Sequence, residues 1–370
     1  MKTAKIGLLG FGNVGGGTYK ILTDNKQIIE KRTGISPEIV KILQRNKKKK
    51  RFASADPALL TEDPDDIIKN PEIDIVVEML GGIEPATSFM VQAMKAGKHV
   101  VSANKAAIAA NYGLLTETAR KSGVRFLFEA SVAGGIPVLT SITGALQSNN
   151  FIEIMGILNG TTNYILTKMT EESLSYEEVL KDAQDKGFAE ADPTADVEGI
   201  DAANKLSILM ALSFDKYVAP EDIPTKGISK ITDRDISSAA SQNKVIKLIG
   251  TARMEDGKLQ YCVQPTLLDN THPLAGVGNE FNAVYITGDM VGELMFYGKG
   301  AGPLPTGSAV CGDIIDIMKK AHIIKRGYRN RISSFFAKDG ENRRERMKKI
   351  SAYYRIIQNF TCMGFFFTLI

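Results

Sequence analysis

The sequence predicts an α/β protein in which a doubly wound parallel sheet precedes a second, α+β domain. Three observations lead to this expectation. An apolar strand, Lys5–Leu9, runs directly into a glycine-rich turn. Short apolar strands then alternate with helical segments up to about residue 130, which is the pattern of parallel sheets. From about Phe151 the chain changes to strands with a hairpin signal, which is typical of antiparallel pairing.

The turn after the first strand has the spacing G-x-G-x-x-G and opens a helix. Its residues are Gly10, Phe11, Gly12, Asn13, Val14 and Gly15. Glycines let the backbone approach a pyrophosphate, and the first N–H groups of the helix point at it. The strand–turn–helix context therefore predicts a Rossmann-type dinucleotide site that takes NAD or NADP.

The second strand, Ile39–Leu43, indicates which dinucleotide binds. An NAD-selective fold places an acidic residue near the end of this strand to hold the ribose hydroxyl. Here Gln44 and Arg45 follow, and then the basic run Lys47–Arg51. We interpret the run as a solvated loop. Arg45 is placed to meet a 2′-phosphate, which favours NADP.

Two further strands are expected at Asp74–Glu78 and Lys98–Val101, separated by a helix from Pro85 to Ala96. Ligands lie at the carboxyl ends of strands in open parallel sheets. Ser102 and Lys105, which follow the fourth strand, are therefore expected at the cofactor crevice. For Lys105 the alternative of a helix-start lysine in solvent stays open on position alone.

A fifth strand, Arg125–Glu129, leads into the turn Ala130–Pro137, which contains two glycines. Such a turn exposes carbonyl oxygens beside the Glu129 carboxylate, and oxygen ligands suit a hard cation. More often such a turn is only a tight bend without an ion.

The second domain is expected to combine strands at Ile152–Leu158 and Glu293–Tyr297 with a hairpin around Glu255–Gly257. Ser175 has the spacing of a capping box and starts a helix. A last helix runs from the Gly300–Thr306 segment to near His322. We divide the chain into residues 1–140, completed by the helix at about 304–322, a substrate-binding and dimerisation domain at 141–303, and a tail at 323–370.

One expected helix, Val197–Ser213, carries two charges on one face. Asp201 and Lys205 are four residues apart, so their side chains are neighbours. The simple interpretation is a surface ion pair, but no charge occurs from Leu206 to Ser213. An almost wholly apolar helix is buried. A lysine near the start of such a helix is partly removed from water, which lowers its pKa and lets it exchange protons. The acidic residues upstream, among them Glu190 and Asp196, suit a cationic substrate group.

Composition narrows the class of protein further. The net charge is +4, but Lys319–Lys349 holds twelve Lys or Arg against three acids, so the remainder is 4 − 9 = −5. General nucleic-acid binding is therefore not expected. Three widely spaced cysteines suit neither a disulfide framework nor zinc and fit a reducing cytoplasm. The first strand starts too early for a signal peptide, and no apolar run has the ~20 residues of a membrane helix.

Taken together, these stretches resemble the homoserine dehydrogenases of bacterial type. The resemblance extends from Lys5 to about Lys319 and is carried by Gly10–Gly17, Val77–Gly82, Ser102–Lys105, Glu129–Pro137, Gly156–Asn163, Gly187–Lys205 and Gly300–Thr306. It implies NAD(P)-dependent interconversion of L-homoserine and L-aspartate 4-semialdehyde in threonine and methionine biosynthesis. It also implies a homodimer or homotetramer.

The resemblance also implies residue roles. Lys205 matches the proton-transferring lysine, Asp201 the acid beside it, and Lys105 the lysine at the nicotinamide and substrate. Glu190 and Asp201 match the substrate-binding carboxylates. Phe11, Asn13, Val14 and Gly302 match cofactor contacts. The sodium ligands, mostly carbonyls, match Glu129, Val132, Gly134 and Ile136.

The tail departs from the family pattern. Many members continue into an ACT-type regulatory domain, and Ile350–Arg355 resembles its opening strand before the sequence ends at Ile370. We expect a truncated regulatory region, residues from about Arg343 that are dispensable for catalysis, and no threonine feedback.

Two other functions stay open. One is an aldehyde-oxidising dehydrogenase that works through a thioester, which needs a nucleophilic cysteine. The other is an NADP-sensing binding protein without turnover, which does not require a lysine and several carboxylates in its core.

Overall fold

A computed structural model describes residues 2–44 and 52–335, with side chains up to residue 320. The described residues up to Ile314 form one compact unit, and those from Ile315 to Phe335 belong to a second. Arg45, the basic run after it and the tail from Arg343 lie outside the described residues. The predictions made for them therefore remain predictions.

The first sheet has six strands and is parallel throughout. Its strands are β1 Lys2–Leu9, β2 Ile35–Leu43, β3 Leu60–Thr61, β4 Ile75–Glu78, β5 His99–Ser102 and β6 Phe126–Leu127. The strand order is β3-β2-β1-β4-β5-β6, and every adjacent pair is parallel. The chain thus reverses its direction of winding between β1 and β4, where a doubly wound sheet binds its ligand. The predicted fold class is confirmed.

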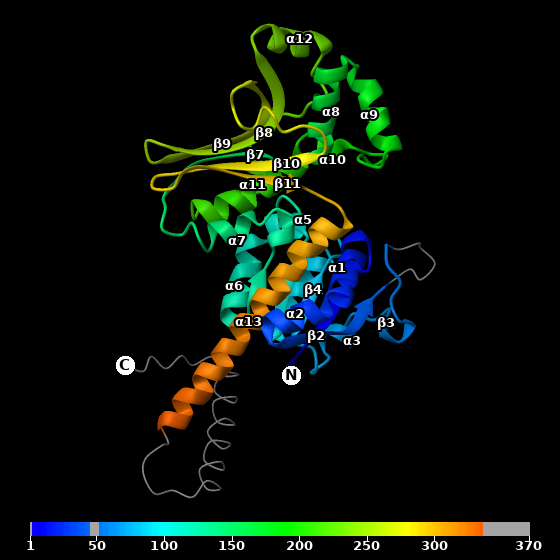
Figure 1. The fold of residues 1–370 in the computed structure, drawn as a ribbon, viewed down its shortest axis with the longest axis vertical. Coiled ribbons are helices and arrows are strands. Elements are labelled where there is room, and N and C mark those ends of the chain that lie inside the picture. The colour runs from blue at the N-terminus through cyan, green and yellow to red at the C-terminus, as the bar shows by residue number, and fades with distance from the viewer. Residues whose placement is uncertain (1, 45–51, 336–370) are drawn as a thin grey trace, which may run out of the picture. The chain divides into compact units, whose positions relative to one another are not determined.

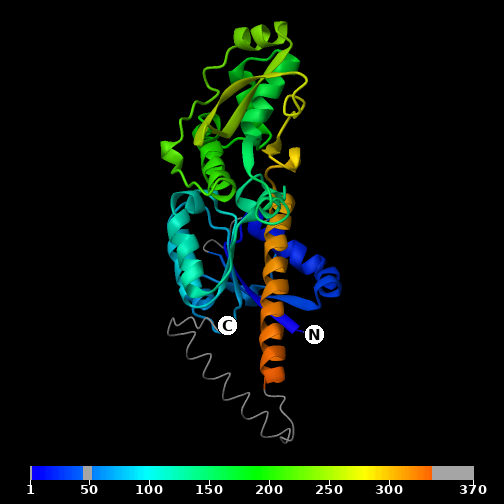
Figure 2. The same cartoon turned by 90° about the vertical axis from the view of Figure 1, so that its left-hand side faces the viewer.

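Helices cover both faces of this sheet. They are α1 Asn13–Asp24, α2 Lys26–Thr33, α3 Asp65–Ile68, α4 Ala86–Lys95, α5 Lys105–Ala110 and α6 Tyr112–Ser122. In Figure 2 the cyan helices of residues 86–122 lie on one side of the sheet and the blue α1 and α2 on the other. The central strands β1 and β4 are consequently buried, as their apolar sequences predict.

The second sheet has five antiparallel strands. They are β7 Phe151–Ile157, β8 Lys244–Glu255, β9 Lys258–Asp269, β10 Phe281–Gly288 and β11 Gly292–Lys299, in the order β11-β10-β7-β8-β9. The predicted hairpin joins β8 to β9, where Asp256 and Gly257 both have positive φ. Two consecutive residues of this kind form the tight turn that matches strand twist.

Helices of the second part lie on or near this sheet, except the first of them, which contacts another helix instead (Figure 1). They are α7 Val138–Ile142, α8 Gly160–Glu172, α9 Tyr176–Asp185, α10 Thr194–Val197, α11 Ile200–Ser213 and α12 Asp233–Ser241. Ser175 makes the predicted capping box with Glu178. The expected helix from Val197 is corrected: α11 begins at Ile200, because Gly199 has a φ of 82° and breaks the helix from α10. Strand β10 and helix α12 were not predicted.

The last described helix, α13, spans Pro303–Phe335. The prediction that it ends near His322 is wrong, because the next residues contain only one glycine and no proline to stop it. Its first turns pack on α1: a Cβ at Gly17 would collide with the Pro303 carbonyl, and the Cys311 thiol donates to the Thr18 carbonyl. Short 3₁₀ segments occur at Pro57–Leu59, Glu129–Ser131 and Pro220–Asp222.

No helix in the described part of the chain is both long and apolar enough to span a bilayer.

Candidate active site

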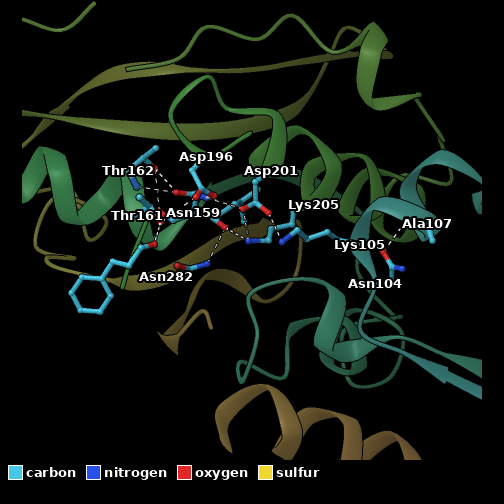
Figure 3. Close-up of polar contacts among 12 residues, drawn as sticks. Asn104, Lys105, Ala107, Asn159, Thr161, Thr162, Asp196, Asp201, Lys205 and Asn282 are labelled. Carbon is cyan, nitrogen blue, oxygen red and sulfur yellow. Dashed lines mark hydrogen bonds and ion pairs between the residues drawn. The ribbon is translucent and has the colours of Figure 1, made fainter. Parts of the chain in front are cut away.

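Lys205 is a buried residue of α11, and its Nζ reaches the carbonyl of Leu158 in the segment between β7 and α8 (Figure 3). Its Nζ is 2.7 Å from Asp201 Oδ2 and 2.6 Å from the carbonyl oxygen of Leu158. The side chains of Lys205 and Asp201 are only 8% and 5% exposed. Burial lowers the pKa of Lys205 against the opposing pull of Asp201. The predicted pair on one helix face is therefore confirmed, and it is buried.

Lys105 contacts this pair from the carboxyl edge of the parallel sheet. It is the first residue of α5, and its Nζ forms an ion pair with Asp201 Oδ1 at 2.7 Å. Burial alone would raise the pKa of Asp201, but the two ammonium groups outweigh it and hold that pKa below its usual value. Burial likewise opposes the charge of Lys105, yet Asp201 raises the pKa of Lys105. The Lys105 ammonium thus contacts Asp201, while 44% of the Lys105 side chain stays exposed to solvent.

Asn159 is a part of the cluster that the sequence analysis missed. Its Nδ2 donates to Asp196 Oδ1 at 2.7 Å and to Asp201 Oδ2 at 2.9 Å. Its Oδ1 accepts the Thr162 N–H at 2.9 Å and so caps α8. The amide is fixed by the helix and bridges two carboxylates that would otherwise repel each other. The cue in the sequence was an asparagine before a helix, which is also the ordinary signal of an N-cap.

Two more acidic residues stand at the approach to the cluster. Asp196 is half-buried, and burial raises its pKa. Glu190 is exposed, and its backbone carbonyl accepts a hydrogen bond from Gln184 Nε2 at 3.2 Å. The negative charge of Glu190 contributes to the raised pKa of Lys105, so it acts on the same site without a direct side-chain contact.

The glycine-rich turn follows β1 as predicted. Gly10 has a φ of 110°, and a Cβ there would lie 2.7 Å from the Met79 carbonyl, so only glycine fits. Gly12 precedes the first helical residue, Asn13, and supplies no side-chain cap. The first N–H groups of α1 are consequently free to meet an anion. Phe11 is buried and packs edge-on against Tyr19.

Gly302 comes to this turn by long-range packing. It precedes Pro303, whose carbonyl lies against Gly17 in α1, and it has a φ of 116°. Val14 is half-buried, Gly15 is buried and Asn13 is exposed, all in the first turn of α1. The predicted cofactor contacts before residue 16 and at Gly302 are therefore neighbours of one helix.

The hydroxyl of Ser102 is engaged within the protein. It donates to Glu78 Oε2 at 2.6 Å and accepts the Asn104 N–H at 3.0 Å. Glu78 is fully buried and also accepts the Leu80 N–H at 2.7 Å. Asn104 in turn caps α5 directly before Lys105. Ser102 and Glu78 thus order the carboxyl edge of the sheet, and the predicted cofactor contact of Ser102 remains a prediction.

In the turn after β6, some groups are suited to bind a cation and others are already engaged within the protein. The Glu129 carboxylate accepts the N–H groups of Leu139 at 2.8 Å and Thr140 at 2.6 Å, so it caps α7. Ala133 and Gly134 both have positive φ, and a Cβ at Gly134 would collide with the Gly300 carbonyl. The carbonyls of Glu129 and Ile136 each accept one backbone N–H. Any ion would therefore meet carbonyls rather than the carboxylate.

Among residues 2–44 and 52–320, no group of three His, Cys, Asp or Glu side chains is arranged to hold a metal ion. Burial raises the pKa of Cys311 to about 12 and also raises that of Cys262. Neither of these two cysteines is a thiolate near neutral pH, which disfavours the thioester mechanism.

The parallel sheet with its glycine-rich turn, next to a buried lysine of lowered pKa, defines an NAD(P)-dependent oxidoreductase. The family model for the homoserine dehydrogenase NAD-binding domain matches residues 10–129, and the homoserine dehydrogenase model matches residues 137–315. The chain belongs to the homoserine dehydrogenase family.

Individual proteins agree with this assignment. Homoserine dehydrogenase of Bacillus subtilis (strain 168) is 47% identical over 323 residues, which are 87% of this chain and 75% of that protein. A crystal structure of a homoserine dehydrogenase from Thiobacillus denitrificans has a TM-score of 0.85 at 43% identity, covering 87% of this chain and 75% of that one. A hyperthermophilic archaeal homoserine dehydrogenase in complex with NADPH has a TM-score of 0.71 at 25% identity, covering 86% and 98%.

Proposed function

We propose that this chain interconverts L-homoserine and L-aspartate 4-semialdehyde with NADP or NAD, with Lys205 as the proton-transfer group. The observation that carries the proposal is the burial of Lys205, which lowers its pKa, between Asp201 and the Leu158 carbonyl. A lysine of this kind exchanges a proton closer to neutral pH than an exposed one.

The proposed mechanism assigns one task to each group. In homoserine oxidation, Lys205 Nζ in its neutral form takes the hydroxyl proton while the carbon that bears the hydroxyl gives up a hydride. The nicotinamide, when bound, supplies the acceptor for that hydride. In the reverse direction the Lys205 ammonium returns the proton to the carbonyl oxygen. Two of the three ammonium hydrogens already have partners, which leaves one for the substrate oxygen.

The substrate ammonium is proposed to bind Glu190 and Asp201. Asp201 also pairs with both lysines. Lys105 contacts its Oδ1 atom, so the Lys105 ammonium meets the substrate on that side of the carboxylate. Asp196 adds a third carboxylate at the same entrance through its bridge to Asn159. This excess of acids matches a cationic amino group better than a neutral alcohol.

A spectrophotometric assay with homoserine and NADP tests the proposal. We expect reduced nicotinamide to form in proportion to the enzyme present, and the semialdehyde to be consumed in reverse. Binding of NADP without turnover would instead identify a cofactor-sensing protein. Turnover lost on mild thiol alkylation would favour the thioester mechanism.

For the cofactor we propose NADP as the preferred form. Support comes from the basic Arg45 after β2, and the archaeal relative described above was solved with NADPH. Arg45→Ala is expected to raise the KM for NADP more than the KM for NAD, because only NADP carries the 2′-phosphate. Steady-state kinetics with both cofactors measure this, and equal increases would remove Arg45 from the site.

We also propose that the turn at Glu129, Val132, Gly134 and Ile136 binds sodium through carbonyls. Its support is the tight turn at Ala133 and Gly134, which both have positive φ, and the carbonyls of Glu129 and Ile136, which each accept one backbone N–H and so keep a second lone pair for an ion. Replacing sodium with choline at constant ionic strength is expected to lower the melting temperature by a few degrees, because an ion that binds the folded state stabilises it. An unchanged melting temperature would contradict the site.

We propose a homodimer or homotetramer in the cytoplasm, with domain boundaries near residues 140 and 303. Met295 and Tyr297 on the edge strand β11 are exposed apolar side chains that a second copy would cover. The boundary near 140 is supported by the family models, which change between residues 129 and 137. Free thiols at Cys262 and Cys311 suit a reducing compartment. Sedimentation analysis measures the oligomeric state.

A further inference from the structure

The carbonyl oxygen of Leu158 accepts two hydrogen bonds from different parts of the fold. Lys205 Nζ donates to it at 2.6 Å from α11, and Asn282 Nδ2 donates at 3.0 Å from β10. Asn282 is completely buried. An asparagine and the proposed proton-transfer lysine therefore share one acceptor (Figure 3).

The surroundings of Asn282 keep its amide in place. The next residue, Ala283, pairs with Ile157 on β7, which sets Asn282 beside Leu158. On its other side the amide lies flat against Gly300, where a Cβ would collide with Asn282 Cγ. The Oδ1 atom is buried without a hydrogen-bond partner among the described residues. A buried unpaired acceptor costs free energy, so the fold does not keep this asparagine for its stability alone.

We propose that Asn282 is a positioning residue that sets the basicity of Lys205 through the carbonyl they share. Two donors on one carbonyl oxygen compete for its electron density, so each holds it less strongly than it would alone. The Asn282 amide thereby weakens the hold of the Leu158 carbonyl on the Lys205 ammonium. Loss of the amide strengthens that hold and makes the lysine harder to deprotonate. This inference rests on the proposed role of Lys205.

Other charges act on Lys205 but do not depend on Asn282. Asp201 lies on the same helix, Asp196 precedes it on α10, and Lys105 approaches from α5. Glu190 contributes through Lys105. Because substitutions at position 282 leave all four charges in place, a change in the pKa of Lys205 reports the shared carbonyl.

Asn282→Leu tests the inference, since leucine has a similar volume, cannot donate and removes the unpaired Oδ1. The readout is the pH profile of kcat/KM for homoserine, whose acidic limb reports the group that must be neutral. We expect that limb to move up by about 0.2 to 0.6 pH unit, because the amide changes the strength of the remaining charged hydrogen bond by a fraction only. Well below the limb kcat/KM falls about 1.6- to fourfold, and the plateau at high pH stays unchanged.

Asn163→Leu is the matched control. Asn163 is also buried, and its Nδ2 donates to the carbonyl of Phe281, the neighbour of Asn282, at 3.1 Å. Its removal loosens the same region without touching the Leu158 carbonyl. We expect a loss of stability and an unmoved pH profile. The same shift in both variants would mean general loosening and would overturn the inference.

Gly300→Ala gives a second test that keeps the asparagine, because the new Cβ displaces the amide from its place. It is expected to move the acidic limb in the same direction as Asn282→Leu. A folded Asn282→Leu variant whose limb is unmoved, or moves down, contradicts the inference. If instead the limb persists in Lys205→Met, the role of Lys205 itself is wrong, which separates the two failures.

Discussion

Lys205→Ala is expected to lower turnover by about 10²- to 10⁴-fold while the fold and the affinity for NADP are kept. This is the usual contribution of a general acid–base group. The ammonium lies between Asp201 and the Leu158 carbonyl, so its removal deprives the substrate oxygen of its proton path. Turnover in both directions, with NADP binding measured by fluorescence, tests the prediction. A comparable loss of NADP affinity would mean that Lys205 is structural.

Lys247→Met is the matched control for this experiment. Lys247 is also buried, and burial lowers its pKa to about 8. Its Nζ donates to the Val277 carbonyl at 2.7 Å, and Val277 is distant in sequence from the residues of the Asp201 cluster. We expect Lys247→Met to lower stability and to leave kcat within about twofold, since a group outside the site takes no part in proton transfer. Equal losses of turnover in the two variants would show that a buried lysine supports activity only by keeping the protein correctly folded.

Asp201→Asn is expected to lower the free energy of unfolding at neutral pH by about 3 to 5 kcal/mol, because it leaves two ammonium groups without their buried partner. Both Lys205 and Lys105 lie 2.7 Å from its carboxylate. Turnover should also fall, because the neutral side chain of the variant neither fixes the position of Lys205 nor balances the charge of its ammonium group. Urea unfolding at pH 7 measures the stability, and a loss below about 1 kcal/mol would contradict this coupling.

The pH dependence of stability gives a second readout for Asp201. Its pKa in the folded protein lies below the usual value because the two lysines outweigh burial. Its contribution to stability is therefore complete above the pKa of an unfolded aspartate, about 4, and is lost as the pH falls further. We expect the variant to lose less stability than the parent between about pH 4 and pH 2. An identical decline in both would mean that Asp201 carries no lowered pKa.

Asp185→Asn provides the exposed counterpart. Asp185 pairs with Lys181 at the same spacing of four residues on α9, with a distance of 2.9 Å, but both side chains are largely exposed. Water screens such a pair, so we expect little change in stability. The contrast with Asp201→Asn isolates burial as the cause.

Local patterns were sufficient for the parts of this protein in which neighbours in sequence are neighbours in space. The glycine-rich turn was recognised from its local spacing and from the positive φ that Gly10 adopts, although the close Met79 carbonyl at Gly10 comes from a distant strand. The Asp201–Lys205 pair follows from helical spacing, and the apolar residues after Lys205 correctly indicated its burial. The capping box at Ser175 and the turn at Gly257 are equally local. Such features depend on steric and hydrogen-bonding rules that act along the chain.

Contacts between distant elements were decided by the tertiary structure. Lys105 reaches Asp201 because the carboxyl edge of the parallel sheet faces α11, and Asn282 reaches Leu158 because β10 pairs with β7. The Glu129 carboxylate meets the N–H groups of Leu139 and Thr140 only because α7 packs against the turn after β6. The sequence by itself determined the doubly wound fold, the dinucleotide turn and the buried lysine–aspartate pair. Only the tertiary structure decided that Lys105, Asn159 and Asn282 join this pair. These residues are far apart in sequence and meet through the order of the strands and the packing of the helices.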